Sequence, residues 1–228
     1  METLNNIVLT IQNYMSNYIL VIALLGAGLW FSIRLGFIQV RGFGESMRRT
    51  FGGLFSKKGA AGKDGMSSFQ ALATAIAAQV GTGNIAGAAT ALAIGGPGAI
   101  FWMWVSAFLG MATIYVEATL AQKFKSTKDG VVVGVPRYYI MAAFKGKFGK
   151  VLAAIFSILI VLALGFMGNM VQSNAIGNAF ESAFNIPAWT MGIAVAAIAV
   201  VIFIGGVKRI ASVTEKLVPF MALLYIVG

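Results

Sequence analysis

The sequence contains neither cysteine nor histidine. The absence of cysteine excludes disulfides and thiolate metal sites, and the absence of histidine removes the commonest metal ligand and the usual general base. Charged residues are also scarce, at 11% of 228 residues, whereas soluble domains have about 25%. An enzyme needs several convergent catalytic groups, so this composition argues against enzymatic activity.

Hydrophobic residues are abundant, at 59%, and the mean hydropathy is +0.86. These values predict an all-α integral membrane protein. The net charge of +10 invites a nucleic-acid-binding interpretation, but the 17 basic residues lie at the ends of apolar runs or in three segments, Arg34 to Lys63, Lys123 to Lys150 and Lys208 to Lys216. Basic segments of membrane proteins concentrate in the cytoplasm, where they face lipid headgroups. The pattern therefore predicts three cytoplasmic segments and an N-terminus outside the plasma membrane.

The apolar runs predict one transmembrane domain over residues 1–228, with six spans at about 18–38, 69–94, 99–122, 151–171, 189–207 and 217–228. Outside these spans we expect a polar tail at 1–17, a turn at 95–98, a short helix from Pro136 and an outside connection at 175–188. For residues 39–68 we expect either an amphipathic helix on the inner leaflet or a solvated basic loop. The last run has twelve residues. That is about 18 Å of helix, too short for a hydrocarbon core of about 30 Å. We therefore expect the chain to be a fragment of a longer protein.

The second run is interrupted by the stretch Ala77-Ala78-Gln79-Val80-Gly81-Thr82-Gly83-Asn84. Two glycines two residues apart weaken a helix, and the Thr and Asn side chains compete for its backbone hydrogen bonds. One interpretation is close helix packing, with Gly83 and Gly87 as a small-xxx-small pair. The other is a broken helix whose free N–H groups bind a carboxylate and whose free carbonyls bind a cation, assisted by the Asn84 amide oxygen and the Thr82 hydroxyl.

Other polar side chains also lie in or at the ends of the apolar runs. Glu117 is the one acid inside a predicted span, and it is either a functional group or, as we favour, an interfacial partner of Lys123 or Arg137. A polar cluster at the end of the fourth span forms either interhelical hydrogen bonds or a cavity lining; its members include Asn169, Gln172 and Asn174.

Several ungapped blocks of the sequence resemble the alanine or glycine:cation symporters, the sodium:alanine symporter family. These blocks are IRLGFIQ at 33–39, GTGNIAG at 81–87, GGPGAIFWMW at 95–104, GMA at 110–112, GNMVQSN at 168–174, KRI at 208–210 and TEK at 214–216. The resemblance implies sodium-coupled uptake of small neutral amino acids, alanine or glycine. It also implies the leucine-transporter-type fold, with the second to sixth spans as the first five-helix repeat and the first span as an extra N-terminal helix.

The same resemblance implies roles for individual residues. The backbone carbonyls of Ala77 and Val80 would ligate one sodium ion, and the Gln79 carbonyl and the Asn84 side chain would serve another position. Thr82 and Gly83 would meet the substrate carboxylate, and Gln172 would face the same cavity.

The chain lacks the second repeat that the resemblance implies. We expect this missing C-terminal half to complete the cavity, so that the 228 residues alone do not transport. The alternative functions are a channel or a structural membrane subunit. A channel would carry a current that does not saturate with alanine, and a structural subunit would tolerate Asn84→Ala and Gly83→Leu.

Overall fold

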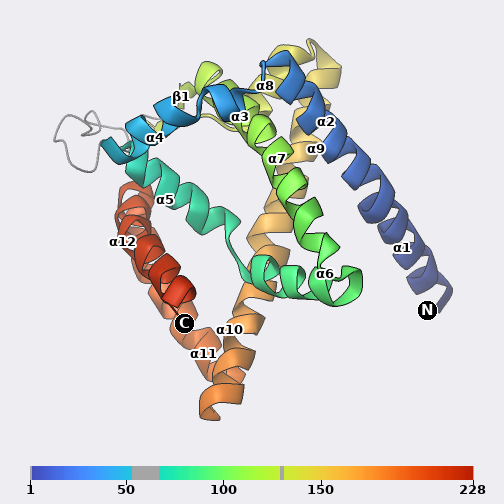
Figure 1. Cartoon of the computed structure of the whole chain (residues 1–228). Coiled ribbons are helices and arrows are strands. Elements are labelled where there is room, and N and C mark those ends of the chain that lie inside the picture. Colours follow the sequence, from blue (N-terminus) through green and yellow to red (C-terminus); the bar gives the residue numbers. More distant parts are fainter. Residues whose placement is uncertain (1, 53–66, 129–130, 228) are drawn as a thin grey trace. The chain divides into compact units, whose positions relative to one another are not determined.

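The computed structural model of the chain describes residues 2–52, 67–128 and 131–227 (Figure 1). Nearly all of these residues are helical. They form two compact units, one of Met1–Phe43 with Gly95–Ser157 and the other of Gly44–Ile94 with Ile158–Gly228. Each unit is described by itself.

The first unit begins with a helical run of three consecutive elements, α1 (Glu2–Tyr14), the π-helix η1 (Met15–Leu20) and α2 (Val21–Arg34). A tight turn leads to α3 (Ile38–Arg41). The rest of the unit contains α7 (Gly98–Lys123), strands β1 (Ser126–Lys128) and β2 (Val131–Val133), α8 (Pro136–Ala143) and most of α9 (Lys147–Ile160). The strands pair antiparallel, with Ser126 opposite Val133. The expected short helix at Pro136 is confirmed, with the proline in its first turn.

Helices α2 and α7 pack closely because Gly28 has no side chain. A Cβ at Gly28 would lie 2.9 Å from the Cβ of Leu109 on α7, a distance that side chains do not adopt. After α2 the chain reverses through Gly36 and Phe37, both with positive φ. This reversal brings the Gln39 amide back to α7, where its Nε2 donates to the carbonyl of Phe108 at 3.2 Å.

The second unit contains α5 (Ser68–Gln79), the π-helix η3 (Gly83–Gly87), α6 (Ala88–Gly95), the π-helix η4 (Val161–Gly168), α10 (Asn169–Phe184), α11 (Ala188–Ile204) and α12 (Gly206–Val227). Helix α5 packs on α12, α10 on α11, and α11 on α12. Helix α6 ends at the predicted turn, where Gly96 has φ +63°. Asn185, with φ 57°, ends α10.

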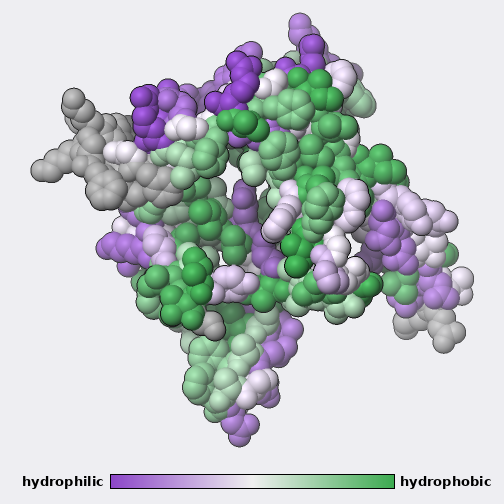
Figure 2. All heavy atoms as spheres, viewed as in Figure 1, coloured by the Kyte–Doolittle hydropathy of each residue, from purple (hydrophilic) through white to green (hydrophobic). Residues whose placement is uncertain are grey.

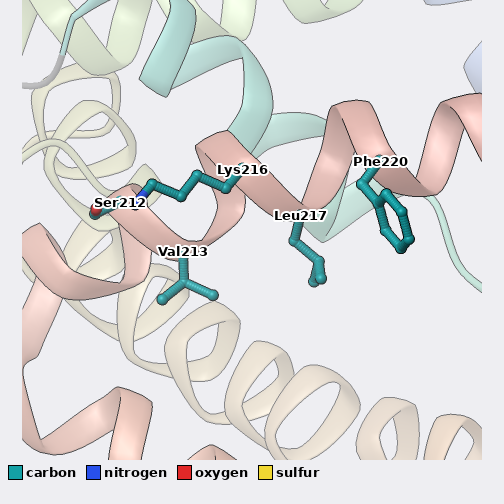
Figure 3. A pocket seen from close by; sticks show the side chains of 5 residues that line it. All are labelled: Ser212, Val213, Lys216, Leu217 and Phe220. Carbon is teal, nitrogen blue, oxygen red and sulfur yellow. The ribbon is translucent and has the colours of Figure 1, made fainter.

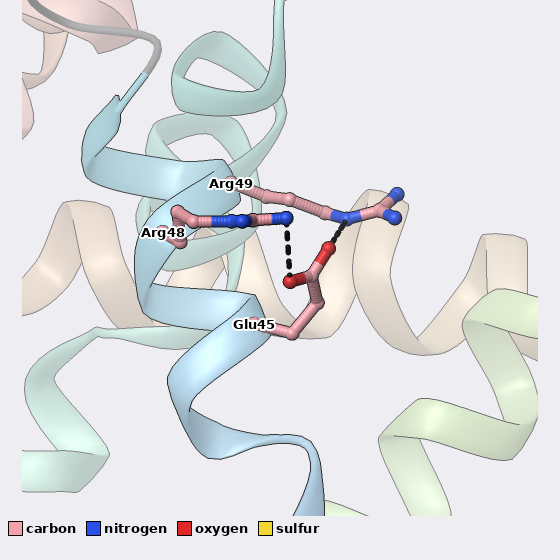
Figure 4. A network of polar contacts seen from close by, with 3 residues as sticks. All are labelled: Glu45, Arg48 and Arg49. Carbon is pink, nitrogen blue, oxygen red and sulfur yellow. Dashed lines mark hydrogen bonds and ion pairs between the residues drawn. The ribbon is translucent and has the colours of Figure 1, made fainter.

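Helix α4 (Phe43–Gly52) covers part of the first basic segment. Glu45 pairs with Arg48 at 3.0 Å and Arg49 at 2.6 Å (Figure 4). The hydrogen bond from Arg49 and the charge of Arg48 lower the pKa of Glu45. The alternatives for residues 39–68 were an amphipathic helix and a solvated loop, and the structure has a helix over 43–52. The contact of this helix with the membrane stays a prediction. Residues 53–66 lie outside the described residues.

Large hydrophobic side chains cover the helices, as Figure 2 shows for one face. Among the described residues the buried hydrophobic side chains are few and small: Ala73, Ala112, Ala153, Ala211 and Val218. Four helical runs in the described part of the chain are long and apolar enough to cross a membrane, namely Asn5–Arg34, Gly98–Lys123, Lys147–Phe184 and Gly206–Val227. An apolar surface of this extent needs lipid around it, and the chain is a multi-pass membrane protein whose membrane-capable elements are all helices.

Three expected helix limits differ from the structure. Residues 2–14, which were expected to belong to a polar tail, form helix α1, and helix α10 continues to Phe184 through most of the expected outside connection. Helix α12 begins at Gly206, not at Leu217, so the third basic segment lies in its first three turns. The expected twelve-residue span is thus the end of a helix of 22 residues.

Candidate functional site

Helical backbone is interrupted within the predicted stretch. Helix α5 ends at Gln79, and Val80 is extended, with φ −93° and ψ 115°. The backbone returns to helical angles at Thr82, and η3 begins at Gly83 (Figure 1). Two backbone hydrogen bonds frame the interruption, from the N–H of Val80 to the carbonyl of Ile76 at 2.8 Å and from the N–H of Asn84 to the carbonyl of Gly81 at 3.1 Å.

Two N–H groups of the interruption are bound by carboxamide side chains rather than by the preceding turn. The N–H of Gly81 donates to Oδ1 of Asn84 at 2.9 Å, and the N–H of Thr82 donates to Oε1 of Gln172 at 3.2 Å. In a continuous α-helix these N–H groups would bind the carbonyls of Ala77 and Ala78. Those two carbonyls therefore lose their usual α-helical donors.

Gln172 reaches the interruption from α10 because position 81 is a glycine. A Cβ at Gly81 would lie 2.1 Å from Nε2 of Gln172, so a side chain there would expel the amide. The π-helix η4 ends four residues before Gln172, and π-helical turns are frequent at functional sites. The structure thus brings together two segments that are 90 residues apart in the sequence.

The predicted site residues are accessible, and all except Gln172 lie in one short stretch of chain. Thr82 is half-buried, and the other predicted members are exposed: Ala77, Gln79, Val80, Gly83, Asn84 and Gln172. Gln172 and Asn84 each bind a backbone N–H of the interruption, as described above. No described residue lies within 4 Å of the position of a Cβ at Gly83 or Gly87, so the described chain provides no packing partner for the alternative small-xxx-small interpretation.

A cation at this site would be bound by neutral oxygens. Within the described ranges no group of three or more acidic residues could hold a metal ion. Carbonyl, hydroxyl and amide oxygens suit a hard, weakly charged cation, and the C-terminal end of α5 adds the negative end of its helix dipole. The first N–H groups beyond the break add a positive partial charge a few residues away.

The other predicted polar residues have different surroundings. Glu117 is exposed on α7 and lies near Tyr139 of α8; burial and this carboxylate raise the pKa of Tyr139. The ion pairs recorded among the described side chains belong to Glu45, so the expected pairing of Glu117 with Lys123 or Arg137 is not present there. Asn169 donates to the carbonyl of Gly165 in its own helical run.

An open groove of about 320 Å³ lies along α12 (Figure 3). One face of that helix forms it, with Ser212, Val213, Lys216, Leu217 and Phe220 as its lining. None of these residues belongs to the interruption.

Sequence reasoning missed one acidic residue in this unit. Glu215 lies inside α12, a helix apolar enough to cross a membrane, and accepts a hydrogen bond from Nε2 of Gln70 at 2.9 Å. Its neighbour Thr214 is 3.1 Å from Thr74, hydroxyl to hydroxyl. The basic residues around it led to the prediction of a cytoplasmic segment outside the spans, although Ala211, Thr214 and Val218 follow a helical spacing.

A sequence model of the sodium:alanine symporter family matches residues 1–228. The chain belongs to this family. It is 40% identical over 226 residues to the sodium/alanine symporter of Methanococcus maripaludis. This match covers 98% of this chain and 49% of the relative. An uncharacterized transporter of Haemophilus influenzae is 45% identical over 225 residues, covering 98% and 48%. The probable sodium/glutamine symporter of Bacillus subtilis is 42% identical over 225 residues, covering 99% and 46%.

The family consists of transporters and not enzymes, and its name gives sodium and alanine as the transported species. The chain spans about half the length of these relatives. What a whole protein with this chain carries is therefore a proposal.

Proposed function

We propose that the chain is part of a symporter in the plasma membrane that couples the uptake of a small neutral amino acid, alanine or glycine, to sodium. Its fold is of the leucine-transporter type, with one transmembrane domain, an extra N-terminal helix and the N-terminus outside. The substrate and the ion share the interruption between α5 and η3.

The observation that carries this proposal is the diversion of the Gly81 and Thr82 N–H groups to carboxamides. This diversion leaves backbone carbonyl acceptors on one side of the interruption and backbone N–H donors on the other, within one turn of chain. The carbonyls at the end of α5, from Ala77 to Val80, provide oxygen ligands for sodium. The N–H groups at Thr82 and Gly83 provide donors for a substrate carboxylate. Broken helices of this kind bind zwitterions together with cations in secondary transporters.

The two carboxamides have different roles in this proposal. The Asn84 contact is local, within three residues, and holds the turn; its amide oxygen can accept from Gly81 and ligate sodium at the same time, since it has two lone pairs. The Gln172 contact comes from another helix and is longer. Gln172 is therefore the side chain that moves when a carboxylate takes the N–H of Thr82.

The test is alanine binding to the purified full-length protein, titrated with sodium chloride and, separately, with potassium chloride. We expect binding that saturates with alanine and requires sodium. In Asn84→Ala, the Gly81 N–H is free to bind the Ala77 carbonyl again, and we expect the half-saturating sodium concentration to rise at least tenfold. Alanine binding that is equal in sodium and potassium would contradict the proposal. A current that does not saturate with alanine would also contradict it and would favour a channel. Unchanged uptake in Asn84→Ala would favour a structural subunit.

A further inference from the structure

Glu215 is a half-buried acid in α12, a helix long and apolar enough to cross a membrane. A half-buried carboxylate needs a hydrogen-bonding partner to compensate for the loss of water. Its partner is the amide of Gln70 on α5, 145 positions earlier in the sequence. One turn further along α5, the Thr74 hydroxyl meets the Thr214 hydroxyl.

These contacts form a seam with matching spacing on both helices. Gln70, Ala73 and Thr74 lie at i, i+3 and i+4 on α5, and Ala211, Thr214 and Glu215 lie at i, i+3 and i+4 on α12. The two alanines are 2% exposed, so the helices approach closely at this level. We call Gln70, Thr74, Thr214 and Glu215 the α5–α12 seam.

Gln70 also belongs to the N-terminal cap of α5. Its Oε1 accepts from the N–H of Ser67, and its own N–H donates to the Ser67 hydroxyl, which together make a capping box. The Gln70 side chain therefore joins the start of α5 to Glu215 through its two polar atoms. A carboxylate beside the first turn of a helix is also favourable for the helix dipole.

The carbonyl end of α5 lies beyond the seam and is exposed at Ala77, Ala78 and Gln79. Gln79 lies about 7.5 Å beyond Thr74 along the helix axis, so a tilt of about 10° at Thr74 would move its carbonyl by about 1.3 Å. Binding groups need positions within about 0.5 Å of the productive geometry, so a small tilt would spoil an ion site.

We propose that Glu215 and Thr214 are positioning residues for the sodium site. Through Gln70 and Thr74 they fix the direction of α5 and so the place of its terminal carbonyls. This inference rests on the proposed function, because it assigns the ion to those carbonyls. It predicts that the seam sets sodium affinity and has little effect on alanine affinity once sodium is saturating.

The test measures alanine binding to the full-length protein as a function of sodium in Glu215→Ala and Thr214→Val. We expect the half-saturating sodium concentration to rise about tenfold in each variant, and the alanine dissociation constant at saturating sodium to stay within about twofold. Exchanging the partners, Gln70→Glu with Glu215→Gln, keeps the hydrogen bond and the capping box. We expect this double variant to restore the sodium dependence to within about twofold of the unmodified protein.

Matched controls remove similar groups elsewhere. The Thr119 hydroxyl bonds to the carbonyl of Tyr115 in its own helix, so Thr119→Val repeats the loss of an intrahelical bond, and Glu181→Ala removes an exposed acid. Because the chain has no cysteine, Thr74→Cys with Thr214→Cys places one cysteine pair at the seam. We expect oxidation of this pair to bring sodium dependence toward that of the unmodified protein and reduction to weaken it, even if a single-residue variant folds poorly.

An unchanged sodium dependence in folded Glu215→Ala and Thr214→Val, or an exchange variant that behaves like Glu215→Ala, would overturn the positioning role. In those cases the unmodified protein still shows sodium-dependent alanine binding, and the proposed function stands. If the unmodified protein itself binds no alanine in sodium, both proposals fall together.

Discussion

Single residues decide which backbone groups are free at the interruption. Gly81 is the clearest case, because its missing side chain leaves space for the Gln172 amide. We expect Gly81→Ala to weaken alanine binding about tenfold, or 1.4 kcal/mol, because the new methyl group takes part of the space that a carboxylate needs beside the Thr82 N–H. Equilibrium binding at saturating sodium measures this effect.

The control for this prediction is Gly87→Ala. Gly87 is exposed, and no described atom beyond its own helical backbone lies within 4 Å of a Cβ there. We expect Gly87→Ala to bind alanine within about twofold of the unmodified protein. Equal losses in both variants would mean that the flexibility of glycine, and not the space beside Gln172, matters at position 81.

At this scale the sequence predicted where the helix is interrupted, and the roles of the site residues stay predictions. The Gly-Thr-Gly-Asn pattern indicated where helical hydrogen bonds compete with side chains, because that competition is local. It could not predict that Gln172, from a helix 90 residues later, binds the Thr82 N–H, since the register of two distant helices depends on their packing. Glu215 was missed for a related reason: basic neighbours dominated the local pattern, and its partner is 145 positions away.

Helices and their ends form the next scale. The sequence located the apolar cores of the helices but placed several ends wrongly, because polarity alone does not end a helix. Helix α10 passes through Asn174 and its polar neighbours and stops only at Asn185, whose positive φ reverses the chain before Pro187. Helix α12 accommodates Lys208 and Arg209 in its first turn because long basic side chains can extend to the headgroups.

The packing of α2 on α7 gives a prediction at the scale of elements. Gly28→Val places a branched side chain against Leu109, where even a Cβ has too little space, so we expect a loss of about 1–3 kcal/mol in stability. Gly26→Val is a matched control two residues earlier, exposed and with no described residue within 4 Å of its Cβ position. Thermal unfolding in detergent measures both, and we expect a lower Tm only for Gly28→Val. Equal Tm values would contradict close packing at Gly28.

On the scale of the whole molecule, the part of the chain that the structure describes combines four helical runs long and apolar enough to cross a membrane with two shorter apolar helices, Gly83–Gly95 and Ala188–Ile204. The thirteen residues of the first of these follow α5 after the interruption. A helix needs about 20 residues to cross a membrane, so neither α5 nor Gly83–Gly95 is long enough to cross alone. In our proposal the two half-helices cross together, which places the interruption at membrane depth, where loose backbone groups persist only if a protein or a wet cavity satisfies them.

The orientation of the chain can be tested with single cysteines, because these 228 residues contain none, once any cysteine elsewhere in the full-length protein has been replaced. Asn5 and Glu181 flank stretches without basic residues, and exposed Lys125 lies in the second basic segment. The proposed orientation places the basic segments in the cytoplasm, so single cysteines at Asn5 and Glu181 should react with a membrane-impermeant maleimide on intact cells. A cysteine at Lys125 should react only after permeabilisation. Labelling of Lys125→Cys on intact cells, with protection of the other two cysteines, would show that the topology is the inverse of the proposed one. The α5 half-helix would then lie on the outer side of the membrane.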